Sequence, residues 1–319
     1  MMDKSSRHDR FGVKLASHGI SNLGSFLLIL RNNSYLLMIA GYVVMLLMAY
    51  AAYGVLFQFS LGMYALLALP LILIVGRHRL AFIKSWVPFL VTILSYEALQ
   101  GVVGALATAG GIFSLYAMDT AIWGFNMTGT IQTALQSQPM TIVMTLLYTL
   151  HLPLVVFASF YFWRSRNGIY KRYVYAIVLT SYCALLTFLL IPTAPPWYEG
   201  TARDLLQGVD STIPVKVYAD LMNLIESDKF AAFPSLHTAY AIIFLYYMKE
   251  RGSLYGLAAL PVTAGILLST LYLGQHYVID LIGGTAYALV SCLLVDRTSV
   301  VHMTQGHPRS TSTCFLIHR

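Results

Sequence analysis

Long apolar runs alternate with short polar segments along most of the chain. A membrane-spanning helix needs about 20 consecutive, mostly apolar residues. Eight runs approach or reach this length: 35–57, 60–76, 85–108, 140–163, 173–191, 231–248, 253–273 and 277–295. The pattern therefore predicts an all-α fold, a polytopic membrane helix bundle of about eight transmembrane helices.

Composition supports a lipid environment. The 319 residues are 58% hydrophobic and 10% charged, whereas an average soluble domain is about 25% charged. So few charges cannot cover a water-facing surface. The net charge is +7, but the Lys and Arg residues show no basic patch or stripe along the sequence. Nucleic acid is therefore not an expected partner. The three cysteines show no CxxC spacing, which argues against a disulfide framework or a zinc site.

The basic residues predict the orientation of the bundle. With eight spans, most of the 20 Lys and Arg residues fall on the side that holds both termini. Only three fall on the other side: Arg203, Lys216 and Lys229. The positive-inside rule then places both termini in the cytoplasm and the long loops 109–139 and 192–230 on the extracytoplasmic or lumenal face.

His276 and Asp280 lie four residues apart at the start of the last predicted span. On a helix this spacing places them on one face, about one turn apart. The carboxylate can hold one imidazole N–H and leave the lone pair of the other nitrogen free, as in an activated nucleophile. A carboxylate in an apolar span costs about 2.5–3.5 kcal/mol on insertion scales, which favours a functional role.

His237 follows Pro234 and Ser235 at a predicted helix start, where backbone N–H groups favour phosphate. The predicted topology places it on the same face as His276. One imidazole can attack phosphorus while the other protonates the departing oxygen. No metal or other cofactor is expected, since no acidic cluster suits magnesium.

Two stretches resemble signatures of the type 2 phosphatidic acid phosphatase superfamily. "PSLH" (234–237) resembles P-S-x-H, and "STLYLGQHYVID" (269–280) resembles S-R-x-x-x-x-x-H-x-x-x-D. The resemblance is specific for the C-terminal half. It implies that this half contains the helical core of that superfamily. It implies that His276 forms a phosphohistidine, Asp280 orients it, and His237 acts as general acid.

The chain departs from this pattern at two positions. Where the family signatures have phosphate-binding arginines, this chain has Thr270 and Ile191. "PTAPPWYE" (192–199), with the two histidine motifs, is instead similar to the aureobasidin-sensitive inositol phosphorylceramide synthase branch. The sphingomyelin synthase branch matches less well, because no C-G-D precedes the first histidine. The resemblance implies a membrane-embedded lipid phosphotransferase of sphingolipid metabolism. Such an enzyme moves a phosphoryl headgroup, such as inositol phosphate, from a phospholipid donor to a lipid-alcohol acceptor such as ceramide.

Another cation is then expected to neutralise the phosphate, and aromatic residues of the outer loop to pack the headgroup. Alternatively, the cations are solvated loop charges, and the aromatic residues only mark the membrane interface. The candidate substrate-binding residues are Ser235, Lys229, Arg203, Lys216, Trp197, Tyr198, Tyr272 and Gln275. Gly283 and Gly284 are expected to allow close helix packing beside the site. Glu97 and His151, both in mid-span, either pair with each other or line a substrate cavity.

Two other functions stay open from the sequence. One is a lipid phosphate or pyrophosphate phosphatase that uses the same site, and the other is a non-catalytic lipid-binding or transport protein. The expected organisation has four parts. These are an interfacial N-terminal segment (1–34), N-terminal transmembrane helices with an outer interfacial loop (35–138), a catalytic transmembrane domain (139–296) and a cytoplasmic tail (297–319).

Overall fold

The structure, a computed structural model, describes residues 111–165, 168–206 and 229–305, with side chains described as far as Arg297. A few single positions before residue 111 are also described. The predicted spans 35–57, 60–76 and 85–108 lie largely outside the described residues, and Glu97 and Lys216 lie outside them entirely.

The described part of the chain is helical and contains no extended strand, which agrees with the predicted all-α class. Two isolated β-bridges, Phe113–Thr193 and Thr193–Ala231, join loops. The helices are α5 (Tyr116–Trp123), α6 (Met127–Leu135), α7 (Gln138–Thr149), α8 (His151–Ser165), α9 (Ile169–Leu190), α11 (Leu236–Arg251), α12 (Ser253–Tyr272) and α13 (Val278–Gln305).

Three described helices are long and apolar enough to cross a membrane: α9, α12 and, within α13, Val278–Arg297. The pair α7 and α8 passes the same test but is bent by 47°, so the described residues hold three or four candidate spans. The predicted span 231–248 is the helix α11, which starts at Leu236 and has 16 residues. Residues 231–235 are not helical because Ser235 caps the helix, its hydroxyl accepting from the Thr238 N–H.

A break at Leu150 separates α7 from α8, within the predicted single span 140–163. Pro153 lies in the first turn of α8. Proline has no N–H to donate, and its ring clashes with the carbonyl four residues earlier, here that of Thr149. The chain therefore bends at this point, and the bend places His151 at the break rather than within a continuous helix.

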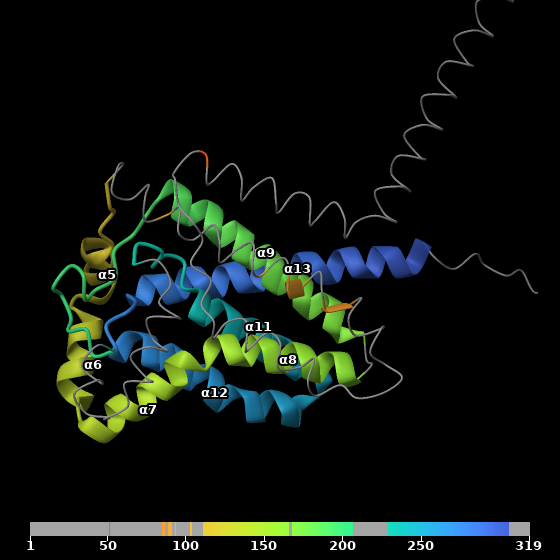
Figure 1. The fold of residues 1–319 in the computed structure, drawn as a ribbon, viewed down its shortest axis with the longest axis horizontal. Coiled ribbons are helices and arrows are strands. Elements are labelled where there is room, and N and C mark those ends of the chain that lie inside the picture. The colour runs from red at the N-terminus through yellow and green to blue at the C-terminus, as the bar shows by residue number, and fades with distance from the viewer. Residues whose placement is uncertain are drawn as a thin grey trace, which may run out of the picture.

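Helix α11 lies inside the bundle and contacts α8, α9, α12 and α13. Ala239, Ile243 and Tyr247, spaced four residues apart, form a fully buried stripe along it. The Tyr240 hydroxyl hydrogen-bonds the Ser181 hydroxyl of α9 at 2.8 Å. Figure 1 shows α5 and α6 at one end of the bundle, where α12 ends and α13 begins.

A polar cluster joins α9, α11 and α13 at the other end of the bundle. Arg172 of α9 forms ion pairs with Glu250 of α11 and with Asp296 of α13, the latter at 3.1 Å. The hydroxyls of Tyr246 and Tyr247 donate to the same Asp296 carboxylate at 2.9 and 3.2 Å. We call these five residues the distal cluster.

Candidate active site

His276 and Asp280 lie together where α12 passes into α13, as the sequence spacing predicts. Asp280 is fully buried and His276 is 5% exposed. Oδ2 of Asp280 accepts the Tyr277 backbone N–H at 2.8 Å and lies 3.4 Å from Nδ1 of His276. The carboxylate is therefore held by the backbone while it faces the imidazole. The 3.4 Å separation is longer than a strong hydrogen bond, and such contacts often shorten only when substrate binds.

His237 lies in the first turn of α11, beside His276. The ring centroids of the two histidines are 5.6 Å apart. His237 is 7% exposed, and its Nε2 has no hydrogen-bond partner among the described residues. Two imidazoles and a carboxylate from motifs about forty residues apart are thus gathered at one point of the fold.

Close backbone packing holds the two motifs together. The Ser235 N–H donates to the Asp280 carbonyl at 3.0 Å. One turn further along α13, a Cβ on Gly284 would collide with the Ser235 carbonyl oxygen, and one on Gly283 would meet the Phe233 ring. Glycine at these positions lets α13 lie directly against the segment that carries His237, as the sequence predicts.

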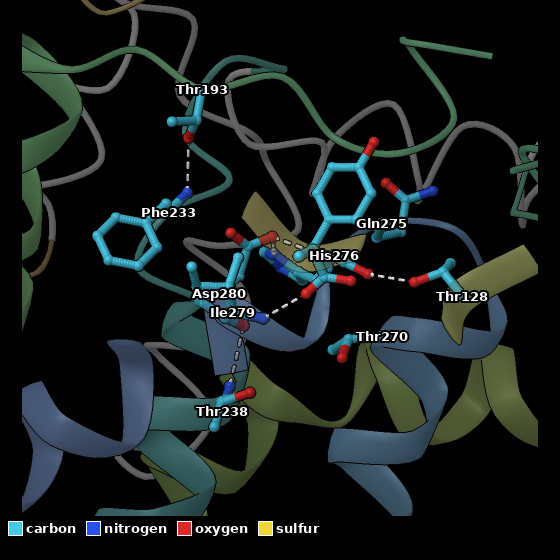
Figure 2. Close-up of polar contacts among 12 residues, drawn as sticks. Thr128, Thr193, Phe233, Thr238, Thr270, Gln275, His276, Ile279 and Asp280 are labelled. Atoms are coloured by element: carbon cyan, nitrogen blue, oxygen red, sulfur yellow. Dashed lines mark hydrogen bonds and ion pairs between the residues drawn. The ribbon is translucent and has the colours of Figure 1, made fainter. Parts of the chain in front are cut away.

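Segment 111–135, which holds α5 and α6, is bonded to the same region. The Thr128 hydroxyl donates to the His276 carbonyl at 3.1 Å (Figure 2). The Gln132 amide donates to the carbonyls of Tyr272 and Arg203 at 3.0 and 2.8 Å. Asp119, buried in α5, accepts the Ile279 N–H of α13 at 2.9 Å. Segment 111–135 therefore braces the loop that carries His276.

Sequence reasoning did not identify Asp119, Thr128 or Gln132. A signal was present, because Asp119 is the only charged residue in the stretch 109–139. A carboxylate in such a segment needs a specific partner when it is buried. The partner here is an N–H of the first turn of α13, so Asp119 caps a helix that is distant in sequence.

Asp119→Ala is expected to destabilise the protein by about 0.5–2 kcal/mol, the usual cost of losing a side-chain helix cap. Asp119→Asn keeps a side-chain oxygen that can accept the Ile279 N–H, so its loss should be smaller. Thermal unfolding of the full chain in detergent measures the difference. Equal unfolding midpoints for the wild type and Asp119→Ala would contradict the capping role.

Loop 192–206 lies against residues 273–277, which join α12 to α13, through polar contacts. The Tyr277 hydroxyl donates to Glu199 at 2.6 Å and also contacts the Thr201 hydroxyl at 2.7 Å. The predicted substrate-binding residues Trp197 and Gln275 are bonded to each other, the indole N–H donating to the amide oxygen at 3.0 Å. Gln275 in turn donates to Asp204 at 3.1 Å.

The two described candidate phosphate-binding cations, Lys229 and Arg203, have different side-chain partners. Lys229 lies over the Trp197 ring, with Nζ 5.8 Å from the ring centroid, and is thus linked to the site through Trp197 and Gln275. Arg203 donates to Gln136 at 2.9 Å in an exposed contact. Thr270, in the position of a signature arginine, is buried and donates to the Leu267 carbonyl. Lys229 is therefore the described cation whose side chain is linked, through Trp197, to Gln275 beside His276.

The remaining predicted residues have structural partners. The Tyr272 hydroxyl bonds the Thr141 hydroxyl at 2.8 Å and so joins α12 to α7. Ser235 caps α11. Tyr198 is about half exposed and contacts the Phe230 ring edge. Their roles in substrate binding stay predictions.

His151, left open from the sequence, reaches the histidine pair. Its ring centroid lies 3.8 Å from that of His237, and the Tyr148 ring stacks on His237 at 4.1 Å. Of the two readings for His151, this position favours the one in which it lines the site. Within the described ranges, no three His, Cys, Asp or Glu residues are grouped to hold a metal ion.

Three curated proteins have sequences similar to part of this chain. Over 146 residues the chain is 24% identical to the inositol phosphorylceramide synthase catalytic subunit of Schizosaccharomyces pombe, covering 42% of this chain and 34% of the relative. Over 162 residues it is 27% identical to a phosphoinositol dihydroceramide synthase of Bacteroides thetaiotaomicron, covering 44% and 50%. Over 190 residues it is 25% identical to the inositol phosphorylceramide synthase of Candida albicans, covering 55% and 40%.

The chain thus spans half or less of the length of these curated relatives. No solved structure matches it. The family match is broader, since it covers residues 114–294 and includes every described residue of the site. On this match, which extends over more than half of its 319 residues, the chain belongs to the PAP2 superfamily.

Proposed function

We propose that the protein is a membrane-embedded lipid phosphotransferase that transfers a phosphoryl headgroup from a phospholipid to a lipid alcohol through a phosphohistidine at His276. The observation that carries the proposal is the grouping of the rings of His237 and His276, 5.6 Å apart, with the Asp280 carboxylate 3.4 Å from His276 Nδ1. A phosphorus atom bound between two such rings has an attacking nitrogen on one side and a proton donor on the other.

The first step forms a bond between His276 Nε2 and phosphorus. Asp280 faces Nδ1, so the lone pair for attack belongs to Nε2, and the carboxylate stabilises the positive charge that develops on the ring. The bond from phosphorus to the diacylglycerol oxygen breaks, and His237 gives its proton to that oxygen. The headgroup phosphate then remains on His276.

The second step reverses these roles. His237, now neutral, takes the proton of the acceptor hydroxyl as its oxygen attacks phosphorus. The phosphorus–nitrogen bond breaks, His276 is restored, and His237 is protonated for the next cycle. With water in place of the lipid alcohol, the same steps make a phosphatase.

Two observations support transfer rather than hydrolysis. The relatives named above are synthases that carry inositol phosphate and ceramide in their names, which suggests a phosphoinositol lipid as donor and a ceramide-type alcohol as acceptor. The two signature arginines of the phosphatases are also replaced, by Thr270 and Ile191. Lys229 and the N–H groups at the start of α11 are the proposed phosphate partners.

The test supplies the purified full chain with phosphatidylinositol labelled in the headgroup and with ceramide, in detergent or vesicles. We expect a labelled headgroup–ceramide lipid whose formation depends on ceramide. Release of free inositol phosphate at a rate that ceramide does not change would support the phosphatase alternative. Lipid binding without any product would support the non-catalytic alternative.

A further inference from the structure

The structure provides His237 with a neighbour that the two-step reaction leaves unused. His151, at the break between α7 and α8, is 9% exposed and lies with its ring centroid 3.8 Å from that of His237. The two rings are tilted by 48°. A histidine in direct contact with the proposed general acid influences how that acid holds its proton.

One nitrogen of His151 is already bound. Nδ1 lies 3.0 Å from the Tyr148 carbonyl oxygen. A carbonyl only accepts, so Nδ1 carries the proton, and the neutral ring has its lone pair on Nε2. His151 therefore offers an acceptor to its surroundings, and the main chain of the broken helix fixes which nitrogen it is.

His237 needs such an acceptor whenever it is protonated. An imidazolium has two N–H groups, and only one of them is used on the oxygen that leaves phosphorus. The other is costly to bury without a partner. Nε2 of His237 is buried and has no hydrogen-bond partner in the described part of the chain, while the Asp280 carboxylate faces His276 instead. The ring of His151 lies against the His237 ring and offers it an acceptor nitrogen.

We propose that His151 is a positioning residue for His237: its Nε2 accepts an N–H of protonated His237 and so directs the other N–H to the leaving oxygen. The bond forms as the tilted His237 ring turns on taking up its proton. The inference rests on the proposed function, because it assigns a partner to the general acid of that reaction.

The test uses two donors that differ in their need for an acid. One is the phospholipid, whose alkoxide leaving group must be protonated. The other is a phosphodiester of the same headgroup with para-nitrophenol, whose phenolate leaves without a proton. The variants are His151→Phe, which keeps a planar ring, and His151→Gln, which restores an acceptor oxygen. His237→Ala is the reference for loss of the acid.

With the phospholipid, His151→Phe is expected to lower kcat about tenfold at nearly unchanged KM, which is part of the roughly 10²–10⁴-fold that general acid–base catalysis contributes. His151→Gln should recover part of the loss. Single-turnover release of nitrophenolate should be slowed far less than phospholipid turnover in both variants and in His237→Ala, because the phenolate needs no proton to leave. Thermal unfolding in detergent identifies folded variants, and if His151→Phe fails to fold, the leaving-group dependence of His151→Gln is the test.

Equal slowing on both donors would mean that His151 acts only through packing and would overturn the inference. Wild-type kcat on the phospholipid in His151→Phe would overturn it as well. Both outcomes leave the proposed function standing if His237→Ala is slowed far more on the phospholipid than on the nitrophenyl donor. A wild-type protein that acts on neither donor would overturn the proposed function together with the inference.

Discussion

His276→Ala is expected to lower transferase turnover by at least about 10³-fold, because the variant has no nitrogen to accept the phosphoryl group and nucleophile losses in enzymes are of this size or larger. His276 Nδ1 faces Asp280, and no other described imidazole has a carboxylate opposite it. His237 therefore cannot replace it as an activated nucleophile. Formation of labelled headgroup–ceramide lipid under initial-rate conditions measures the loss.

Asp280→Asn serves as a matched comparison, since it keeps the size of the side chain and an oxygen for the Tyr277 N–H. It removes the charge that stabilises the His276 ring, so we expect an intermediate loss. Acid-labile phosphate on the protein, trapped during turnover, should be present in the wild type and absent from His276→Ala. Turnover near the wild-type rate in a folded His276→Ala variant would exclude the phosphohistidine mechanism.

Gly284→Ala is expected to reduce both stability and turnover, although Gly284 contacts no substrate. The added Cβ would collide with the Ser235 carbonyl oxygen, and it would lie 3.2 Å from the Thr238 Cβ. Backbone cannot turn away as a flexible side chain can, so α13 must move from the segment that carries His237. Overpacking of this kind costs about 1–3 kcal/mol. It would also stretch the Ser235–Asp280 backbone bond, whose length is 3.0 Å.

Gly265→Ala is the matched control for this change. It is also a helical glycine next to a neighbouring helix, but its added Cβ would meet only the methyl groups of Leu147, at 3.1 and 3.2 Å. These methyls lie at the end of a side chain that can shift. Thermal unfolding and initial rates in detergent should therefore separate the two variants. Equal behaviour of Gly284→Ala and Gly265→Ala would contradict the close packing of α13 on residues 233–238.

The centre of the site was predictable because its residues follow local rules. The four-residue spacing of His276 and Asp280 survives in the turn that starts α13, and Ser235 begins α11 as a helix cap. The positions of the apolar runs also identify α9, α12 and α13 as candidate spans. The eight-span count, the sidedness and the division into four segments stay predictions, since most of the first three spans lies outside the described residues.

The contacts by which segment 111–135 braces the loop that carries His276 could not be predicted in the same way. Asp119, Thr128 and Gln132 bind backbone groups of residues 140 to 160 positions away, and no periodic pattern encodes such pairs. His151 poses the same difficulty, since its contact with His237 depends on a bend that Pro153 introduces into one apolar run. A continuous run of apolar residues predicts one span whether or not the helix is broken within it.

The distal cluster has a consequence for the chemistry at the opposite end of the molecule. Glu250 follows His237 on α11, and Asp296 follows Asp280 on α13, by about four turns, or roughly 20 Å of helix. Arg172 forms ion pairs with both helices there. These ion pairs restrain α11 and α13 from sliding along each other. The positions of α11 and α13, which set the distance between the His237 and His276 rings, are thus restrained from the far end of both helices as well. Removal of the Arg172 ion pairs is thus expected to slow the proposed transfer, although none of these side chains contacts the lipid in the proposed reaction.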